Sequence, residues 1–207
     1  IEANPESLTE SKINIFLKHN INRISMGLQS SDDSELKLMN RHHSFDDVKD
    51  KDNLLRDKGI NNISIDIMYS LPGQTMESLK KTVKDALSLK VSHLSLYSLT
   101  VEENSVFGKK GYKSLDEDTE ADMYEYIVDT LVKYGYHQYE IANFCLPGYE
   151  SKHNLGYWHY DDYLALGPGS TSKYNHQRIE KTNNIKTYLN NSELIENIEI
   201  LSNEAEA

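Results

Sequence analysis

The sequence has few of the residues that build cross-linked or repetitive proteins. Cys145 is the single cysteine among 207 residues, which excludes an internal disulfide and any metal site made of several thiolates. Only four proline and ten glycine residues are present, which excludes collagen-like and low-complexity sequences. No apolar run approaches the roughly 18 residues of a membrane span. The chain also opens without the basic and apolar stretches of a secretory signal.

Acidic residues outnumber basic residues. There are 22 Lys and Arg residues against 33 Asp and Glu residues, so the formal net charge is −11. Because a nucleic-acid surface usually needs a basic face, we expect no nucleic-acid partner. Without a membrane span, an acidic, cytoplasmic protein is expected. A chain of this length should bury roughly 70% of its unfolded surface, enough for one large domain or two small ones.

Strand and helix signals alternate over the first half, which is typical of βα units. We expect strands over residues 22–27, 62–69 and 93–98. Thr9, Ser44 and Thr75 are placed to cap the helices between them. The spacing of about 30 residues suits parallel strands joined by helical crossovers. After these come an expected helix from 117 to 134, a strand over 137–143, a polar aromatic loop over 153–163 and a short helix near 189.

Polar residues lie where these strands end. Glu2, Gln29 and Asp66 are in or just after strand-like segments, and Arg41 lies a little beyond one. In a parallel βα array the loops at the carboxyl ends of the strands build the site, so these side chains could converge. Alternatively, Asp66 faces a neighbouring helix and Arg41 is a solvated charge. Spacing alone leaves both interpretations open.

Six runs in fixed order resemble the radical S-adenosylmethionine coproporphyrinogen III oxidase family. The runs are 1–5 (IEANP), 22–29 (NRISMGLQ), 40–43 (NRHH), 66–75 (DIMYSLPGQT), 137–150 (HQYEIANFCLPGYE) and 153–158 (HNLGYW). Any one run is weak evidence, whereas six in the right order and spacing are specific. The resemblance extends over nearly the whole chain and fades after about residue 191.

The resemblance implies an α/β fold, a partial TIM-like (β/α)6 barrel followed by a smaller mixed α/β region. We therefore expect a barrel part over 1–110, a barrel-closing region over 111–191 and an acidic tail over 192–207. The family binds a [4Fe–4S] cluster and S-adenosylmethionine. The S-adenosylmethionine contacts that carry over are Glu2, Gln29, Arg41 and Asp66. Arg41 offers a planar fork for the methionine carboxylate, and the other three offer acceptors.

The sequence departs from the family at the cluster. Members hold it with a CxxxCxxC run, in which three thiolates bind three irons, and no such run is present here. The glycine-rich turn that normally follows is missing as well. We therefore expect an N-terminally truncated piece with about four of the six barrel strands, which carries no cluster and is inactive by itself.

The family contains oxygen-independent coproporphyrinogen III oxidases and HemW-type haem chaperones. The HNxxYW run over 153–158 is typical of the chaperone branch, so the resemblance favours a protein that binds haem and passes it to acceptor proteins. The alternative is the oxidase, which makes protoporphyrinogen IX by oxidative decarboxylation. A third interpretation, a TIM-like domain without a ligand, is disfavoured by the six ordered runs.

His153 is the candidate haem ligand, because imidazole ligates haem iron, and Trp158 could pack on the porphyrin. Alternatively, this run only caps the barrel. We expect it as a loop over the barrel mouth, near Gln29, Asp66 and Tyr97, since side chains with apolar faces and polar tips suit a rim. Cys145 is interpreted as an ordinary buried thiol and not as a haem ligand.

Overall fold

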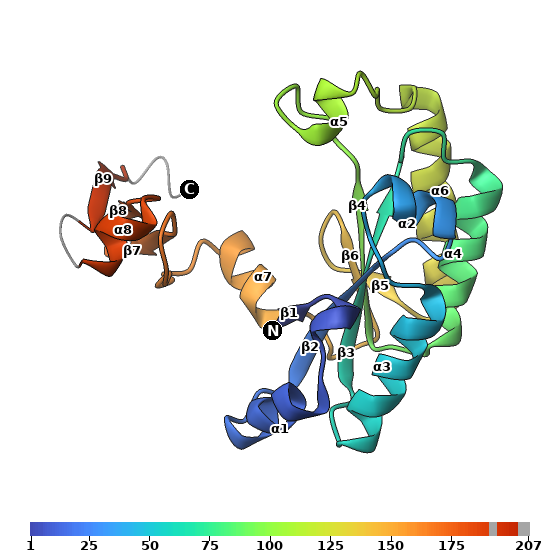
Figure 1. Cartoon of the computed structure of the whole chain (residues 1–207), viewed down its shortest axis with the longest axis horizontal. Helices are drawn as coiled ribbons and strands as arrows, with labels where there is room; N and C mark the ends of the chain where they lie inside the picture. Colours follow the sequence, from blue (N-terminus) through green and yellow to red (C-terminus); the bar gives the residue numbers. More distant parts are fainter. Residues whose placement is uncertain (191–193, 203–207) are drawn as a thin grey trace. The chain divides into compact units, whose positions relative to one another are not determined.

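The computed structural model describes residues 1–190 and 194–202, and its chain folds as two compact units. Unit 1 is Ile1–Glu150, and unit 2 begins at Ser151 (Figure 1). The division therefore lies at residue 150, whereas the sequence led us to expect it near 110. The difference arises because the segment that follows residue 110 adds a helix and two strands to the sheet of unit 1.

Unit 1 contains a six-stranded mixed sheet in the order β1-β2-β3-β4-β6-β5. The strands are β1 (Glu2–Ala3), β2 (Arg23–Gln29), β3 (Asn62–Tyr69), β4 (His93–Ser98), β5 (His137–Gln138) and β6 (Asn143–Cys145). The first four are parallel, and β6 pairs antiparallel with both β4 and β5. The expected partial barrel is thus confirmed. The single strand predicted over 137–143 is wrong, because the chain turns back within it to form the β5–β6 hairpin.

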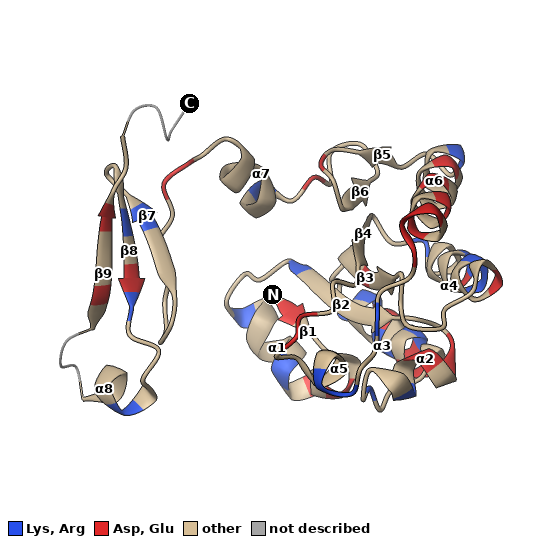
Figure 2. Ribbon diagram, turned by 90° about the horizontal axis from the view of Figure 1, so that it is seen from above, with Lys and Arg blue, Asp and Glu red and all other residues tan. Residues whose placement is uncertain are grey.

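The helices of unit 1 are η1 (Pro5–Ser7), α1 (Glu10–Lys18), α2 (Asp33–Leu38), α3 (Phe45–Asp57), α4 (Met76–Ser88), α5 (Val106–Lys109) and α6 (Glu117–Lys133). The three longest, α3, α4 and α6, lie on one side of the sheet (Figure 1). Thr9, Ser44 and Thr75 cap α1, α3 and α4 as predicted, each accepting a backbone N–H of the first turn. The acidic first turn of α6 suits the positive end of its dipole (Figure 2).

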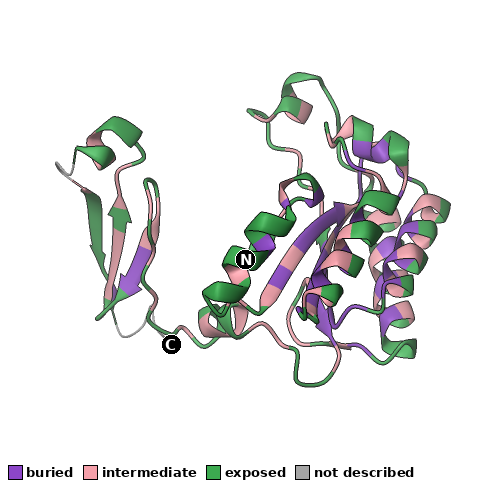
Figure 3. Cartoon of the chain, turned by 60° about the horizontal axis from the view of Figure 1, so that its bottom comes forward, coloured by how far each residue is buried: buried purple, intermediate pink, exposed green. Residues whose placement is uncertain are grey.

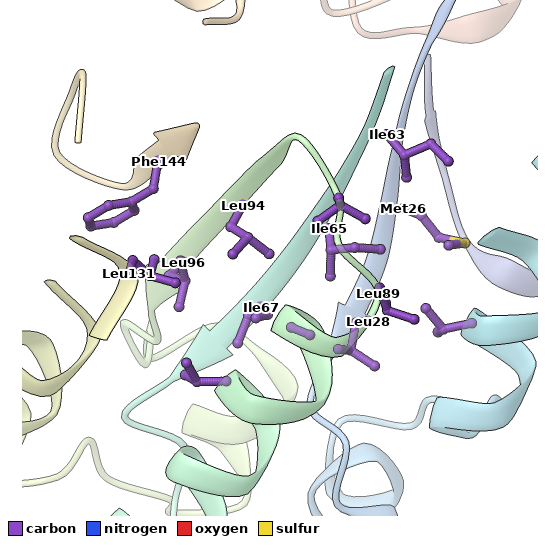
Figure 4. Packing of buried hydrophobic residues seen from close by; sticks show 14 of the residues in the cluster. Met26, Leu28, Ile63, Ile65, Ile67, Leu89, Leu94, Leu96, Leu131 and Phe144 are labelled. Atoms are coloured by element: carbon purple, nitrogen blue, oxygen red, sulfur yellow. The ribbon is translucent and has the colours of Figure 1, made fainter. Parts of the chain in front are cut away.

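Alternation along the strands separates an apolar face from a polar face. Ile63, Ile65 and Ile67 of β3 are fully buried against the helices, together with matching residues of β2 and β4 (Figure 4). Each such side chain contributes about 1.5–3 kcal/mol on burial. Buried residues accordingly concentrate on the strands and on the helix faces turned toward them (Figure 3). Because neighbouring side chains of a strand point to opposite sides, Ser64 and Asp66 lie on the other face, here called the inner face.

A hydrogen-bonded chain crosses the inner face at the amino ends of the strands. Ser64 Oγ lies 2.8 Å from His93 Nδ1, and His93 Nε2 lies 2.8 Å from the hydroxyl of Tyr139. Burial lowers the pKa of His93 to about 3, and the positive charge of Arg23 acts in the same direction. His93 is therefore neutral and relays hydrogen bonds between β3, β4 and the hairpin.

Unit 2 contains a three-stranded antiparallel sheet in the order β7-β8-β9. Its elements are α7 (Lys152–Trp158), β7 (Thr171–Tyr174), β8 (Gln177–Lys181), α8 (Ile185–Leu189) and β9 (Ile195–Ile200). The expected smaller mixed α/β region is confirmed, but two details are wrong. The HNxxYW run forms helix α7 and not a loop, and β9 occupies the start of the expected tail. Residues 192–193 and 203–207 of that tail lie outside the described residues. No helix of the described chain has the length and apolar character needed to cross a membrane.

A buried carboxylate joins the loops that follow β2 and β3. Glu35 of α2 is only 7% exposed. It accepts hydrogen bonds from Ser30 Oγ at 2.5 Å, Ser78 Oγ at 2.6 Å and Gln74 Nε2 at 3.1 Å. Three donors from three segments satisfy this side chain, which is the condition for a buried charge to be tolerated. Glu35 thereby fixes the loops at the carboxyl ends of the strands.

Replacement of Glu35 tests this anchor. Glu35→Ala removes the acceptor shared by Ser78 and the buried Ser30 and Gln74, so we expect the free energy of unfolding to fall by about 2–4 kcal/mol in urea titrations. Glu77→Ala is the control, since Glu77 on α4 makes only an exposed pair with Lys80 and should cost at most about 0.5 kcal/mol. Equal losses in the two variants would contradict the anchoring role.

The lowered pKa of His93 makes stability depend on pH. Above pH 6.5 the His93 side chain is neutral in both the folded and the unfolded protein. Between pH 6.5 and about pH 3, His93 is protonated in the unfolded protein but stays neutral in the folded protein. Stability should therefore fall as the pH drops from 6.5 toward 3. Between pH 7 and pH 5 the loss should be about 2 kcal/mol larger for the wild type than for His93→Gln, measured by urea unfolding. Parallel pH profiles of the two proteins would refute this assignment.

Candidate functional site

The four side chains predicted to contact S-adenosylmethionine come together. Glu2, Gln29, Arg41 and Asp66 line one pocket of about 290 Å³, along with Ala3, Asn4 and Gly27. We call it the strand-end pocket. Parallel pairing explains the convergence, because Glu2 aligns with Ser25 on β2, and Gly27 aligns with Asp66 on β3. Residues that are distant in the sequence are thus neighbours across three strands.

The end of β2 has a conformation that depends on glycine. A bulge interrupts the pairing between Gly27 and Gln29, and Gln29 has a positive φ of 66°. Its side chain folds back over Gly27: a Cβ at position 27 would lie 2.5 Å from Gln29 Nε2 and 3.5 Å from Asn4 Oδ1. Glycine therefore leaves room for the amide that lines the pocket.

Asp66 belongs to the inner face of the sheet. Ser25 Oγ donates to both of its carboxylate oxygens, at 2.9 and 3.1 Å. The interpretation that Asp66 faces a neighbouring helix is therefore wrong. Burial raises the pKa of Asp66 above its usual range, and the negative charge of Glu2 adds to the effect, although hydrogen bonds from Ser25 and Ser95 oppose it. A donor or cation from a ligand would relieve this unfavourable burial.

Arg41 supplies the positive charge of the strand-end pocket. Its Nη1 donates to Asn4 Oδ1 at 2.9 Å, and its backbone N–H donates to the carbonyl of Leu36 at 2.8 Å, which fixes the turn after α2. The hydrogen bond to Asn4 therefore orients the Arg41 side chain, which is not a freely solvated charge. With the guanidinium and the carboxylates of Glu2 and Asp66 lining one pocket, the arrangement suits a ligand that carries a carboxylate together with ammonium or hydroxyl donors.

Three residues that shape the strand-end pocket were not predicted from the sequence. Asn4 orients Arg41, Ser25 binds Asp66, and Gly27 makes room for Gln29. The sequence contains a signal for Ser25, because this residue alternates with the apolar residues of β2 and so shares a face with the polar residues of β3. Finding it required the register between the two strands, which the sequence of either strand does not contain.

Helix α7 sets the geometry of the second predicted site. His153 and Tyr157 are four residues apart and therefore share a face, where their rings pack edge to face with centroids 4.8 Å apart. Trp158 is five residues from His153, about 140° around the helix, so the two side chains leave α7 in different directions. Tyr157 lies beside His153, in a small cavity of about 200 Å³ that is also lined by Lys152, Gly156, Asp161, Asp162 and Tyr163. The place of α7 over the barrel mouth stays a prediction.

A [4Fe–4S] cluster does not fit the residues of this chain. Such a cluster needs three thiolates, whereas Cys145 is the one cysteine. Cys145 lies on β6, fully buried, and burial raises the pKa of its thiol to about 11. Its expected character as a buried thiol is confirmed. The strand-end pocket, by contrast, offers a guanidinium and two carboxylates, which suit the carboxylate, ammonium and hydroxyl groups of S-adenosylmethionine.

The chain is similar to a known superfamily and to curated proteins. Residues 1–86 match the model of the radical SAM superfamily. The chain is 44% identical to the heme chaperone HemW of Lactococcus lactis subsp. lactis (strain IL1403), over 83% of this chain and 46% of the relative. It is 39% identical to the heme chaperone HemW of Bacillus subtilis (strain 168), over 91% of this chain and 51% of the relative. The chain thus spans about half the length of the curated relatives it matches.

A solved structure shares the fold. Coproporphyrinogen III oxidase (HemN) from Escherichia coli, described as a radical SAM enzyme, superposes with a TM-score of 0.84 at 19% identity, covering 98% of this chain and 51% of that one. At this identity the likeness establishes the fold alone. Together with the HemW relatives, it confirms the resemblance on which the site assignments rest. Residues 1–86 therefore match the radical SAM superfamily, and the chain is similar to heme chaperones HemW over 83–91% of its length.

Proposed function

We propose that this chain is the part of a HemW-like haem chaperone that binds S-adenosylmethionine in the strand-end pocket and haem on α7. The observation that carries the proposal is the convergence of Glu2, Gln29, Arg41 and Asp66, which the family resemblance picks out, in one pocket. The HemW relatives support the chaperone over the oxidase, since identity reaches 44% with the former. Haem-accepting proteins are the partners that this function requires, and the cytoplasm is the proposed location.

Each side chain of the strand-end pocket has a role in holding the cofactor. Arg41, oriented by Asn4, binds the carboxylate of the methionine moiety through its planar fork. Asp66 and Glu2 accept hydrogen bonds from its ammonium group or ribose hydroxyls, and the amide of Gln29 completes the polar lining. In a protein that also held the cluster, bound S-adenosylmethionine would supply radical chemistry. This chain contributes positioning of the cofactor.

The haem part of the proposal rests on α7. His153 offers an imidazole, Tyr157 packs against it edge to face, and Lys152 lines the same cavity. An imidazole binds haem iron, an aromatic face packs on the porphyrin, and a cation pairs with a propionate. The helix thus presents three suitable groups within seven residues.

Calorimetry with S-adenosylmethionine tests the strand-end pocket. Arg41→Ala removes the partner of the ligand carboxylate, so binding should weaken by about 2 kcal/mol or more. Asp66→Asn should weaken it less, because the amide keeps one acceptor. Lys37→Ala, a change of an exposed basic residue of α2 outside the pocket, is the matched control and should bind like the wild type. Wild-type affinity in both pocket variants would overturn the assignment.

Haem titration followed by absorbance tests α7. We expect His153→Ala to shift or abolish the Soret band and to weaken haem binding by about tenfold, or about 1.4 kcal/mol, because the iron loses its imidazole ligand. His159→Ala, which changes the C-cap residue of the same helix, is the control and should leave the spectrum unaltered. An unaltered spectrum in His153→Ala would leave only a capping role for this residue. Anaerobic decarboxylation of coproporphyrinogen would then favour the oxidase.

A further inference from the structure

Among the residues that the structure describes, one group of three metal-ligating side chains contains no residue of either proposed site: His137, Cys145 and Glu150. Antiparallel pairing sets His137 directly opposite Cys145 across β5 and β6. Directly opposed residues of a hairpin lie on the same face, so their side chains meet. Glu150 follows β6 after a short turn and returns to the pair, its carboxylate oxygen 2.9 Å from His137 Nε2.

We propose that His137, Cys145 and Glu150 form a binding site for a zinc ion, with the fourth coordination position left to water or a small ligand. The donors are one thiolate, one imidazole and one carboxylate, all within 4.8 Å of one another. These are the ligand types that Zn²⁺ takes, and three protein ligands with one open position is a common arrangement. Ca²⁺ and Mg²⁺ prefer sites made of oxygen atoms only.

Two of the three donor-to-donor distances come close to those of tetrahedral coordination, and the third, between Cys145 Sγ and the Glu150 carboxylate, is at most 4.8 Å. With Zn–S at about 2.3 Å and Zn–N at about 2.0 Å, a tetrahedral angle separates sulfur and nitrogen by about 3.5 Å. Cys145 Sγ lies 3.7 Å from His137 Nε2. For nitrogen and oxygen the corresponding separation is about 3.3 Å, so the Glu150 carboxylate must move outward by a few tenths of an ångström. Its side chain is 30% exposed and has room for this movement.

Access and charge also suit a cation. Cys145 is fully buried, whereas the side chains of His137 and Glu150 are 42% and 30% exposed, so an ion would enter from solvent and meet the sulfur last. On binding, the S–H bond breaks, the proton passes to solvent and the sulfur electron pair forms the bond to zinc. The thiolate and the carboxylate then balance the two positive charges of the ion. In the absence of an ion, burial and the charge of Glu150 raise the pKa of Cys145, and Arg23 opposes them only in part, so the charge of the zinc ion must stabilise the thiolate.

The alternative is an ion pair between His137 and Glu150 beside an inert thiol. A cobalt titration of the whole chain, prepared without a histidine tag, separates the two. We expect one Co²⁺ per chain, a thiolate-to-cobalt charge-transfer band, visible bands of tetrahedral cobalt, and loss of all of them when Zn²⁺ is added. Cys145→Ser should abolish the charge-transfer band. His137→Ala should weaken zinc binding by more than the roughly 10–100-fold that outer partners of a metal ligand contribute.

Two controls keep this test decisive. His19→Ala changes an exposed histidine at the end of α1 and should leave cobalt binding intact. Glu150→Gln alters a partly exposed side chain, so it should fold even if changes at the buried Cys145 do not, and it should still weaken zinc binding. The proposal is overturned if the folded wild type gives no charge-transfer band, or if Glu150→Gln and the wild type bind zinc equally. Because none of the three residues lies in the strand-end pocket or on α7, the result is independent of the haem and S-adenosylmethionine experiments.

Discussion

The two-residue alternation of β2, β3 and β4 is the constraint on which the rest of unit 1 depends. It sends Ile63, Ile65 and Ile67 toward the helices, and it sends Ser64 and Asp66 to the inner face. A slip of one residue in the pairing would exchange the two sets and would lose the core and the site together. The same apolar residues that stabilise the sheet therefore hold the polar ones in register.

The inner face carries different chemistry at the two ends of its strands. At the amino ends, His93 links Ser64 to Tyr139 and stays neutral, while Arg23 donates to Asn62 and to the Tyr149 carbonyl. These groups satisfy one another and tie the hairpin to the sheet. Toward the carboxyl ends, Asp66 is buried at a cost that its serine partners only partly offset. A binding site is expected where a buried charged group lacks enough hydrogen-bond donors or opposite charges to offset its loss of hydration. Asp66 in the strand-end pocket meets that condition.

Much of unit 1 was predictable because its signals are local. The caps Ser44 and Thr75, and the alternation over residues 62–69, each specify an element without help from distant parts of the chain. The convergence of Glu2, Gln29 and Asp66 followed from a topological rule that applies to any parallel array. The β5–β6 hairpin escaped prediction, because its strands of two and three residues are too short to show a period.

Helix α7 and Cys145 show why residue type alone does not settle a role. The polar aromatic content of residues 153–158 suggested a loop, but Ser151 caps a helix there, and the helical turn then decides that Tyr157 and not Trp158 accompanies His153. Cys145 is unremarkable as one cysteine in 207 residues. Its proximity to His137 comes from the antiparallel register of a hairpin that only the folded chain defines. Where function depends on pairs of residues from different segments, it is the register between those segments that determines the chemistry.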